Sequence, residues 1–242
     1  MVRAAPADGS GDARTWRLAF EQPAAVSRLV LASASPARLA TLRAAGIEPE
    51  VVVSGVDESV VEAQDPAELV LQLARLKAQA VVRRLRAGAG PGTWVLGCDS
   101  VLALDGQILG KPGHPAEAVR RWRAMRGRSG VLHTGHCLVD PAGGVEVARS
   151  VATTVHFVEV TDEEIAAYVA TGEPLQVAGA FTLDGLGGAF VSGIEGDHHN
   201  VVGLSLPVLR EMFAELGVRW TDLWRVSASE QPTGPGAPVR PG

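Results

Sequence analysis

Hydroxyl and guanidinium groups occur together where a short apolar run ends. The run Leu29–Leu31 has the character of a buried strand, and Ser33, Ser35 and Arg38 follow it closely. Ser35 suits a helix N-cap, and the proline after it suits the first helical turn. Hydroxyls, free amides and a guanidinium would then meet at a helix N-terminus, where the dipole favours an anion. The pattern predicts either a phosphate cradle or an ordinary strand-to-helix turn with a surface arginine.

A carboxylate interrupts a second apolar segment. Asp99 stands next to Ser100 inside the otherwise apolar stretch Leu96–Val101. Burial of a charge costs several kcal/mol unless the charge is paired or bound to a metal. Asp99 is therefore either a structural partner, of an internal arginine or of a neighbouring element, or a functional group. As a functional group it would be a metal ligand or a general base at the end of a strand.

Three further charged residues could complete such a site. Glu58 follows an apolar segment and offers a second carboxylate, and a Mg²⁺ ion needs one or two carboxylates beside phosphate oxygens and waters. Lys111 is preceded by a glycine, but its spacing from Gly106 does not fit a P-loop. Lys77 lies on an apolar stretch of a predicted helix. Taken alone, each lysine is more often a solvated or snorkelling side chain than a ligand.

Alternating helices and strands must position these groups. The predicted strands cover residues 28–33, 50–54, 94–98, 101–104, 108–109, 130–139, 145–159 and 189–194. The predicted helices cover 36–45, 66–86, 115–126, 205–216 and a segment that follows a capping box at Thr161 and stops at Gly172. Asp105-Gly106 and the segment 140–144 predict hairpin turns. This order favours an α/β domain with a mixed sheet.

Length and composition indicate a soluble globular protein. The chain has 242 residues, of which 46% are hydrophobic and 20% charged. We expect an ordered domain over residues 27–222, with a disordered extension over 1–26 and a disordered tail over 223–242, because both ends lack sustained periodicity. The net charge of −5 argues against a broad nucleic-acid-binding face. We therefore expect no stable nucleic-acid partner.

Other residue types fit structural roles. Cys98 and Cys137 lie in strand-like contexts and are expected to be reduced core residues. We recognise no signal peptide and no apolar run long enough to span a bilayer. These features together predict a cytoplasmic protein without membrane contact. His133 and His136 would point to opposite faces of a strand, and the adjacent His198-His199 pair, expected in a loop, need not converge. The apolar stripe of the predicted helix 205–216 fits a core better than a homodimer interface, although it could serve either.

Several segments, in this order along the chain, resemble the Maf family of nucleoside triphosphate pyrophosphatases. They are Ser33–Arg38, Asp57-Glu58, Leu73–Ala78, Gly97–Ser100, Gly110–Pro112, Tyr168–Pro174, Ala178–Phe181, Glu195-Gly196 and Asn200–Leu204. The resemblance covers residues 28 to about 217. It implies an elongated α/β fold like that of inosine triphosphate pyrophosphatases, with the active site in a cleft between two lobes.

The resemblance also implies an activity and residue roles. The activity is hydrolysis of a nucleoside triphosphate to the monophosphate and pyrophosphate with a divalent cation, in a family associated with nucleotide-pool housekeeping and restraint of cell division. Asp99 matches the family's proposed proton acceptor. The residues that match its polar cleft groups are Ser33, Arg38, Glu58, Lys77 and Lys111. We expect Asp99 and Glu58 to hold Mg²⁺ or Mn²⁺, which suits carboxylate ligands.

The chain departs from the best-known branches of the family at several positions. Ala37 replaces an arginine, Ser100 a threonine and Asp184 a glutamine of the branch that cleaves dTTP and UTP, and Val177 replaces a lysine. The Trp and Gln that the 7-methyl-GTP branch carries at the first two positions are absent too. We expect Ser100 and Asp184 to contact substrate, and the base preference stays open.

Two functions from different classes follow. An enzyme would show metal-dependent release of pyrophosphate. A non-catalytic nucleotide-binding regulator of cell division would bind triphosphates, or a protein partner, without turnover. The carboxylates and lysines together favour the enzyme, because a sensor has no need of a group that activates water.

Overall fold

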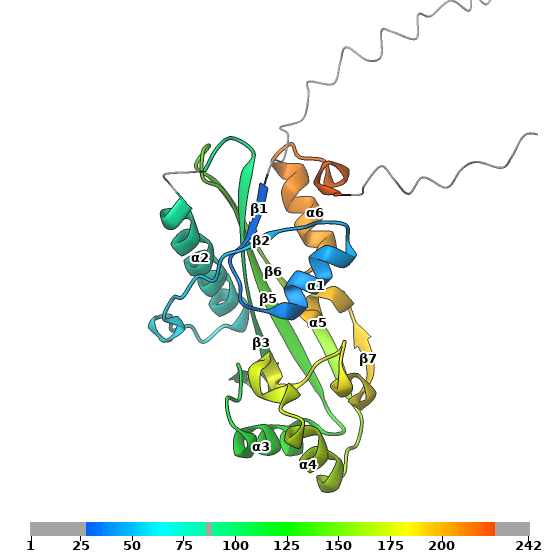
Figure 1. Ribbon diagram of the computed structural model, residues 1–242. Helices are drawn as coiled ribbons and strands as arrows, with labels where there is room; N and C mark the ends of the chain where they lie inside the picture. Colours follow the sequence, from blue (N-terminus) through cyan, green and yellow to red (C-terminus); the bar gives the residue numbers. More distant parts are fainter. Residues whose placement is uncertain (1–27, 86–88, 226–242) are drawn as a thin grey trace, which may run out of the picture.

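The computed structural model describes residues 28–85 and 89–225, and a long mixed sheet forms their centre (Figure 1). The strands are β1 (Arg28–Leu31), β2 (Glu50–Val51), β3 (Thr93–Leu104), β4 (Gln107–Leu109), β5 (Ser129–Asp140), β6 (Val145–Phe157) and β7 (Val191–Glu195). Their order is β2-β1-β3-β5-β6-β7, with β4 paired to β3. β1 runs parallel to β2 and β3, and the remaining pairs are antiparallel. The predicted α/β fold with a mixed sheet is confirmed.

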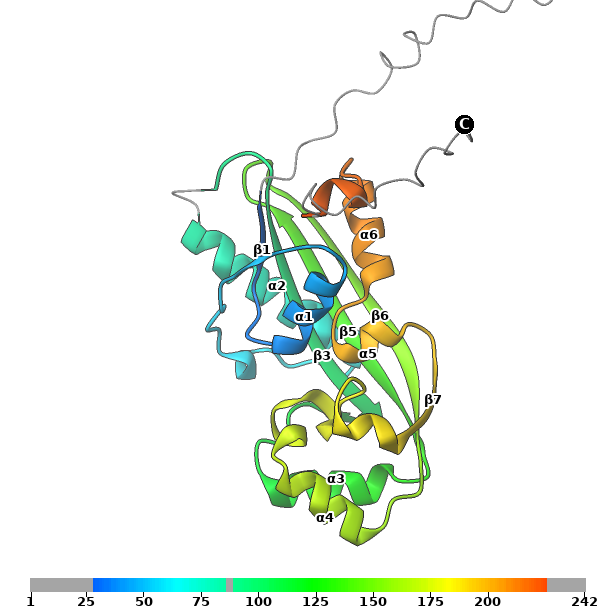
Figure 2. The same ribbon diagram turned by 45° about the vertical axis from the view of Figure 1, so that its right-hand side comes forward.

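Helices cover both faces of the sheet and one end of it (Figures 1 and 2). The α-helices are α1 (Pro36–Ala44), α2 (Pro66–Leu85), α3 (Pro115–Met125), α4 (Asp162–Ala170), α5 (His198–Val202) and α6 (Leu206–Glu215). The short 3₁₀ helices are η2 (Glu58–Val60), η3 (Glu173–Gln176), η4 (Ala178–Ala180), η5 (Leu186–Phe190) and η6 (Trp220–Leu223). α2 packs on one face, and α1, α5 and α6 lie on the other. α3, α4 and η3–η5 form a second lobe around the far end of the long strands.

Local signals act where the sequence places them. The Ser35 hydroxyl accepts a hydrogen bond from the amide of Arg38 and caps α1, and Thr161 forms a complete capping box at the start of α4. Asp105 and Gly106 both adopt positive φ, at 50° and 74°, in the turn between β3 and β4. Positive φ at both central residues is what a tight type I′ hairpin requires. The cap and turn predictions are confirmed.

Several boundaries differ from prediction. The strands expected at 94–98 and 101–104 are one continuous strand, β3, because Asp99 stays in register opposite Gly135 of β5. β2 has two residues, not five. His198 and His199 lie in a helix and not in a loop, because the Asp197 side chain accepts from the amide of His199 and caps α5. The extension predicted over 1–26 lies outside the described residues, as does the tail beyond Arg225; Leu223, in η6, is buried.

Two strand glycines bring α2 close to the sheet. A Cβ on Gly97 of β3 would collide with the carbonyl oxygen of Ala74, and a Cβ on Gly135 of β5 would collide with that of Val70. Glycine at a strand interior commonly marks such a close backbone approach. This close approach of α2 to the sheet brings Lys77 of α2 into contact with Asp99 of β3, two residues after Gly97.

Apolar packing fixes both lobes. The far lobe closes around Trp122, whose ring makes edge-to-face contacts with Phe157, Tyr168 and Phe190. In α6, Leu209, Met212 and Phe213 are fully buried, so the helical stripe packs in the core as the sequence favoured. Cys98 and Cys137 are free and buried, as expected. Among the described helices, none combines the length and apolar character that crossing a bilayer requires.

Stability should fall with acid because of His136. This histidine is fully buried, and its Nε2 accepts from the amide of Ser205 at 2.8 Å. Burial, aided by the nearby Arg38 charge, lowers the pKa of His136 to about 4. A base whose pKa falls on folding binds fewer protons in the native state, so its destabilising effect appears below the unfolded pKa near 6.5 and grows as pH falls toward 4.

The measurement is urea unfolding of the wild type and of His136→Gln between pH 7.5 and 4. Gln has an oxygen that can accept from Ser205 and does not titrate. The variant should lose less stability over this interval than the wild type. Equal pH slopes for the two proteins would contradict the assignment, because His133, whose pKa burial also lowers, is present in both.

Candidate functional site

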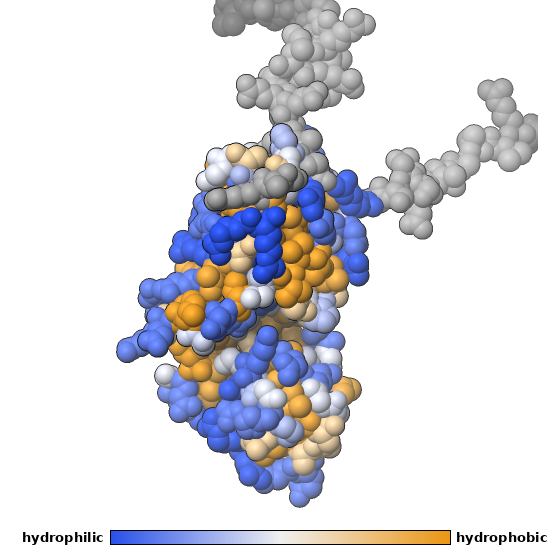
Figure 3. Space-filling model, turned by 60° about the vertical axis from the view of Figure 1, so that its left-hand side comes forward, coloured by the Kyte–Doolittle hydropathy of each residue, from blue (hydrophilic) through white to orange (hydrophobic). Residues whose placement is uncertain are grey.

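A cleft of about 580 Å³ lies between the two lobes. The space-filling view shows the surface hollowed between the upper and lower parts of the molecule (Figure 3). One wall comes from the turn between β1 and α1, the segment before η2, α2, β3 and the end of α5. The opposite wall comes from the segments 176–178 and 181–184 of the far lobe, and Lys111 also faces the cleft. Every residue expected in the site lies on this lining.

The centre of the cleft is an acidic pair around one buried ammonium. Lys77 is 7% exposed, and its Nζ contacts Oδ1 of Asp99 and lies 2.8 Å from Oε1 of Glu58. Burial alone would raise the pKa of Glu58, but the hydrogen bond from Lys77 and the charges of Lys111 and Arg38 hold it below its usual value. Asp99 is paired, as one of the two predictions for it required, and its partner is a lysine and not an arginine.

Arg38 joins three separate segments at the edge of this centre. Its Nε donates to the carbonyl of Gly203 at 2.7 Å, and its Nη1 to the carbonyl of Cys98 at 2.9 Å and to the Ser33 hydroxyl at 3.1 Å. Nη2 donates to Ser100 at 2.9 Å. A guanidinium has five N–H groups, so about one remains for a ligand. Arg38 thus holds the cleft wall together and keeps a donor for an anion.

Hydroxyls extend this network into the core. Ser33 also accepts from the amide of Ser35 at 3.2 Å. Ser100 lies 2.9 Å from the hydroxyl of Thr134, and Thr134 donates to the carbonyl of Asn200 in α5 at 3.0 Å. Thr134 and Asn200 are fully buried. Sequence reasoning assigned neither a role, because a threonine inside a predicted strand carries no signal of which loop it will meet.

The two remaining predicted residues lie on the exposed rim. Lys111 and Asp184 are both exposed and line the cleft. Asp184 stands beside apolar groups, among them Phe181 and Leu183, on the far-lobe wall. A carboxylate repels phosphates, so this end suits the uncharged part of a ligand. The cationic end at Lys77, Arg38 and Lys111 suits a polyanion.

The donor set at the centre fits a hard divalent cation. Asp99 and Glu58 each use one oxygen for Lys77, and the second oxygen of each has no hydrogen-bond partner among the described residues. Both side chains line the cleft, where phosphate oxygens and water can complete a coordination shell. All-oxygen ligation by carboxylates, phosphates and water is what Mg²⁺ and Mn²⁺ prefer.

Glu173 organises the far-lobe wall. One carboxylate oxygen accepts from the hydroxyl of Tyr168 at 3.0 Å, the hydroxyl of Thr182 at 2.5 Å and the amide of Gly187 at 3.1 Å; the other accepts from the amide of Leu186 at 3.1 Å. Burial would raise the pKa of Glu173, but these hydrogen bonds hold it below its usual value. The loop that carries Asp184 is therefore fastened at both ends to one ionised carboxylate.

Replacement of Glu173 by Gln should weaken ligand binding more than turnover. A glutamine amide would direct N–H groups toward amides that also donate, so part of the loop would lose its anchor. A loss of 1–2 kcal/mol corresponds to a KM about 5- to 30-fold higher, with kcat changed far less. Steady-state kinetics with the nucleoside triphosphate that the resemblance implies as substrate measures the split. Glu163→Gln, an exposed residue of α4, is the control, and a change in kcat alone would contradict the positioning role.

The fold and the cleft define an α/β protein with a charged site between two lobes. Residues 28–216 match the family model described as Maf-like protein. The chain is 63% identical over 214 residues to a nucleoside triphosphate pyrophosphatase of Salinispora tropica. The aligned region covers 88% of this chain and 94% of that protein. The chain is 60% identical over 197 residues to one of Streptomyces coelicolor, covering 81% and 94%. The chain belongs to the Maf family, as its motifs predicted.

Proposed function

We propose that this protein hydrolyses nucleoside triphosphates to the monophosphate and pyrophosphate. The observation that carries the proposal is the convergence of Asp99, Glu58 and Lys77 with Arg38 and Lys111 in one cleft. The names of the relatives from Salinispora tropica and Streptomyces coelicolor support the same reaction. A triphosphate carries about four negative charges, so the departure of pyrophosphate from its α-phosphorus requires cations to disperse charge.

The residues divide the chemistry between them. The carboxylate of Asp99 orients a water molecule and accepts its proton as the oxygen attacks the α-phosphorus. The bond from the α-phosphorus to the bridging oxygen breaks, and pyrophosphate leaves. Lys77, Lys111 and the free N–H of Arg38 neutralise charge on the departing group, while Ser33 and the amides at the start of α1 bind phosphate oxygens.

Asp99 and Glu58 are the residues that would hold a divalent cation. When bound, Mg²⁺ or Mn²⁺ supplies Lewis-acid stabilisation of the phosphate charge. On the opposite wall, Asp184 and the apolar groups near it face the base, and Ser100, held by Arg38, contributes to the floor of the site. The product, a nucleotide that has lost pyrophosphate, suits a housekeeping role in the nucleotide pool.

The test is turnover of a panel of common and modified nucleoside triphosphates by the purified chain in H₂¹⁸O. Monophosphate and pyrophosphate should appear in equal amounts, with ¹⁸O in the monophosphate, and EDTA should abolish the reaction until Mg²⁺ or Mn²⁺ is restored. Release of a diphosphate and phosphate, or label in the pyrophosphate, would overturn the proposed attack. Tight binding without turnover of any nucleotide would favour the non-catalytic regulator instead.

A further inference from the structure

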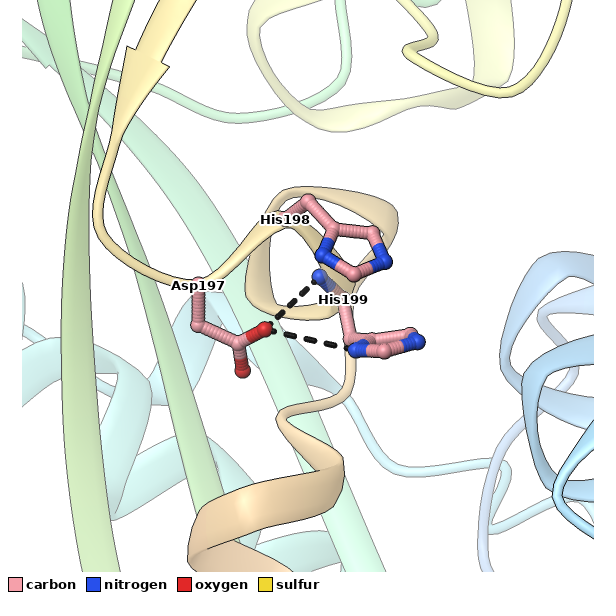
Figure 4. Close-up of side chains that lie close together, drawn as sticks. All are labelled: Asp197, His198 and His199. Atoms are coloured by element: carbon pink, nitrogen blue, oxygen red, sulfur yellow. Dashed lines mark hydrogen bonds and ion pairs between the residues drawn. The ribbon is translucent and has the colours of Figure 1, made fainter.

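The first turn of α5 gathers three metal-binding side chains outside the cleft. One potential ligand atom from each of Asp197, His198 and His199 lies within 4.8 Å of the other two. Figure 4 shows that a nitrogen of each imidazole lies on the side that faces the Asp197 carboxylate. The sequence alone offered no reason for these adjacent histidines to converge, and they were expected in a loop; in the structure they lie in a helix and their ligand atoms converge. Both rings belong to the first turn of α5, which Asp197 caps.

The contacts in this cluster leave its ligand atoms available. Asp197 Oδ1 accepts from the amide of His199 at 2.9 Å and lies 3.4 Å from His199 Nδ1. Asp197 Oδ2 is buried and has no hydrogen-bond partner among the described residues. The two rings pack with centroids 3.7 Å apart and a tilt of 39°, and His198 is exposed. A carboxylate with an oxygen beside two close imidazoles, and with its other oxygen unpaired, is an arrangement that a cation would stabilise.

The donor chemistry separates this cluster from the cleft. Asp99 and Glu58 offer oxygen only, which suits Mg²⁺ and Mn²⁺. Two imidazole nitrogens and one carboxylate oxygen instead suit borderline transition metals, and two histidines with one carboxylate is a common ligand set for Zn²⁺ with water in an open position. From this set we propose that Asp197, His198 and His199 form a binding site for a divalent transition metal of the Zn²⁺ class.

The location of the site gives the metal a structural consequence. α5 has five residues, and its other end holds the cleft wall: the carbonyl of Asn200 accepts from Thr134, and that of Gly203 accepts from Arg38. A ligand that binds only the folded state stabilises it by mass action. A metal across the first turn would therefore stabilise the helix that anchors Arg38.

The experiment measures Zn²⁺ binding to the purified full chain by equilibrium dialysis, with millimolar Mg²⁺ present to occupy oxygen sites. We expect one Zn²⁺ per chain. Asp197→Asn keeps an oxygen that can cap α5, so it should fold normally and yet bind Zn²⁺ at least about tenfold more weakly. His198→Ala and His199→Ala should weaken binding by at least as much. Co²⁺ alone should give a visible absorption spectrum that these variants lose.

Two controls keep the proposal falsifiable. Asp99→Asn alters the cleft and should leave Zn²⁺ affinity unchanged, and His114→Asn, which retains a cap on α3, should do the same. Zn²⁺ should raise the Tm of the wild type and of both controls, but not of Asp197→Asn. Zn²⁺ binding that survives in the Asp197 and histidine variants, or that disappears in Asp99→Asn, would overturn the site. Neither result depends on nucleotide turnover.

Discussion

Replacement of Asp99 by Asn should lower kcat by about 10²- to 10⁴-fold, the contribution expected of a general base. Asn keeps the size of the side chain and an oxygen that can accept from Lys77, and Glu58 continues to pair with the same ammonium. The fold and the cationic end of the cleft should therefore persist. What the variant lacks is a group that can take the proton of the attacking water.

The measurement is kcat and Kd for the best nucleotide, with Kd taken from binding in EDTA. The Kd should change less than about tenfold, because the residues that would contact phosphate remain. Asp140→Asn is the matched control: Asp140 caps the turn between β5 and β6, where its side chain accepts from the amide of Ala142. If Asp99→Asn turned over like the Asp140 variant, Asp99 would have no part in the chemistry.

The sequence predicts which residues line the cleft better than it predicts which residues they contact. Ser33, Arg38, Glu58, Lys77 and Asp99 were expected together on the resemblance of their motifs, and all line the cleft. The partner of Asp99 could not be predicted, because it depends on how closely α2 approaches the sheet. The helix can come this close because two glycines of the strands have no side chain in its way. The local sequence pattern does not show which helix will pack against those glycines.

Long-range hydrogen bonds show the same limit. Arg38 donates to the carbonyl of Gly203, a residue 165 positions later. Glu173 accepts from backbone amides of a loop, and a backbone amide is present whatever the residue type, so the sequence gives no sign of these bonds. Such contacts depend on tertiary packing, not on periodicity. By contrast, a signal for α5 was present and unused: Asp197 is a good N-cap residue and stands directly before His198. Helix-start chemistry therefore locates short helices that hydrophobic periodicity cannot detect.

Replacement of Arg38 by Met should lower the free energy of unfolding by about 2–4 kcal/mol, since hydrogen bonds from a charged donor and orphaned buried acceptors carry costs of this size. Methionine fills much of the same volume but donates nothing. The carbonyls of Gly203 and Cys98 would then lose the donor that Arg38 supplies in the buried wall, and three segments would lose their common tie. Urea unfolding followed by circular dichroism gives the difference.

Two further variants separate the effect of the charge of Arg38 from that of its geometry, and both from the loss of any arginine on α1. Arg38→Lys keeps the charge, but a single ammonium cannot reach acceptors on three segments at once, so it should recover only part of the stability and of kcat/KM. Arg43→Met removes an exposed arginine of the same helix, paired with Glu48, and should lower the free energy of unfolding far less than Arg38→Met does. Equal losses for Arg38→Met and Arg43→Met would show that Arg38 is not a tie. Only the planar guanidinium of Arg38 can bind the cleft wall and an anion at the same time, so lysine should not replace it. Full recovery in Arg38→Lys would show instead that the charge at this position matters more than the geometry of the guanidinium.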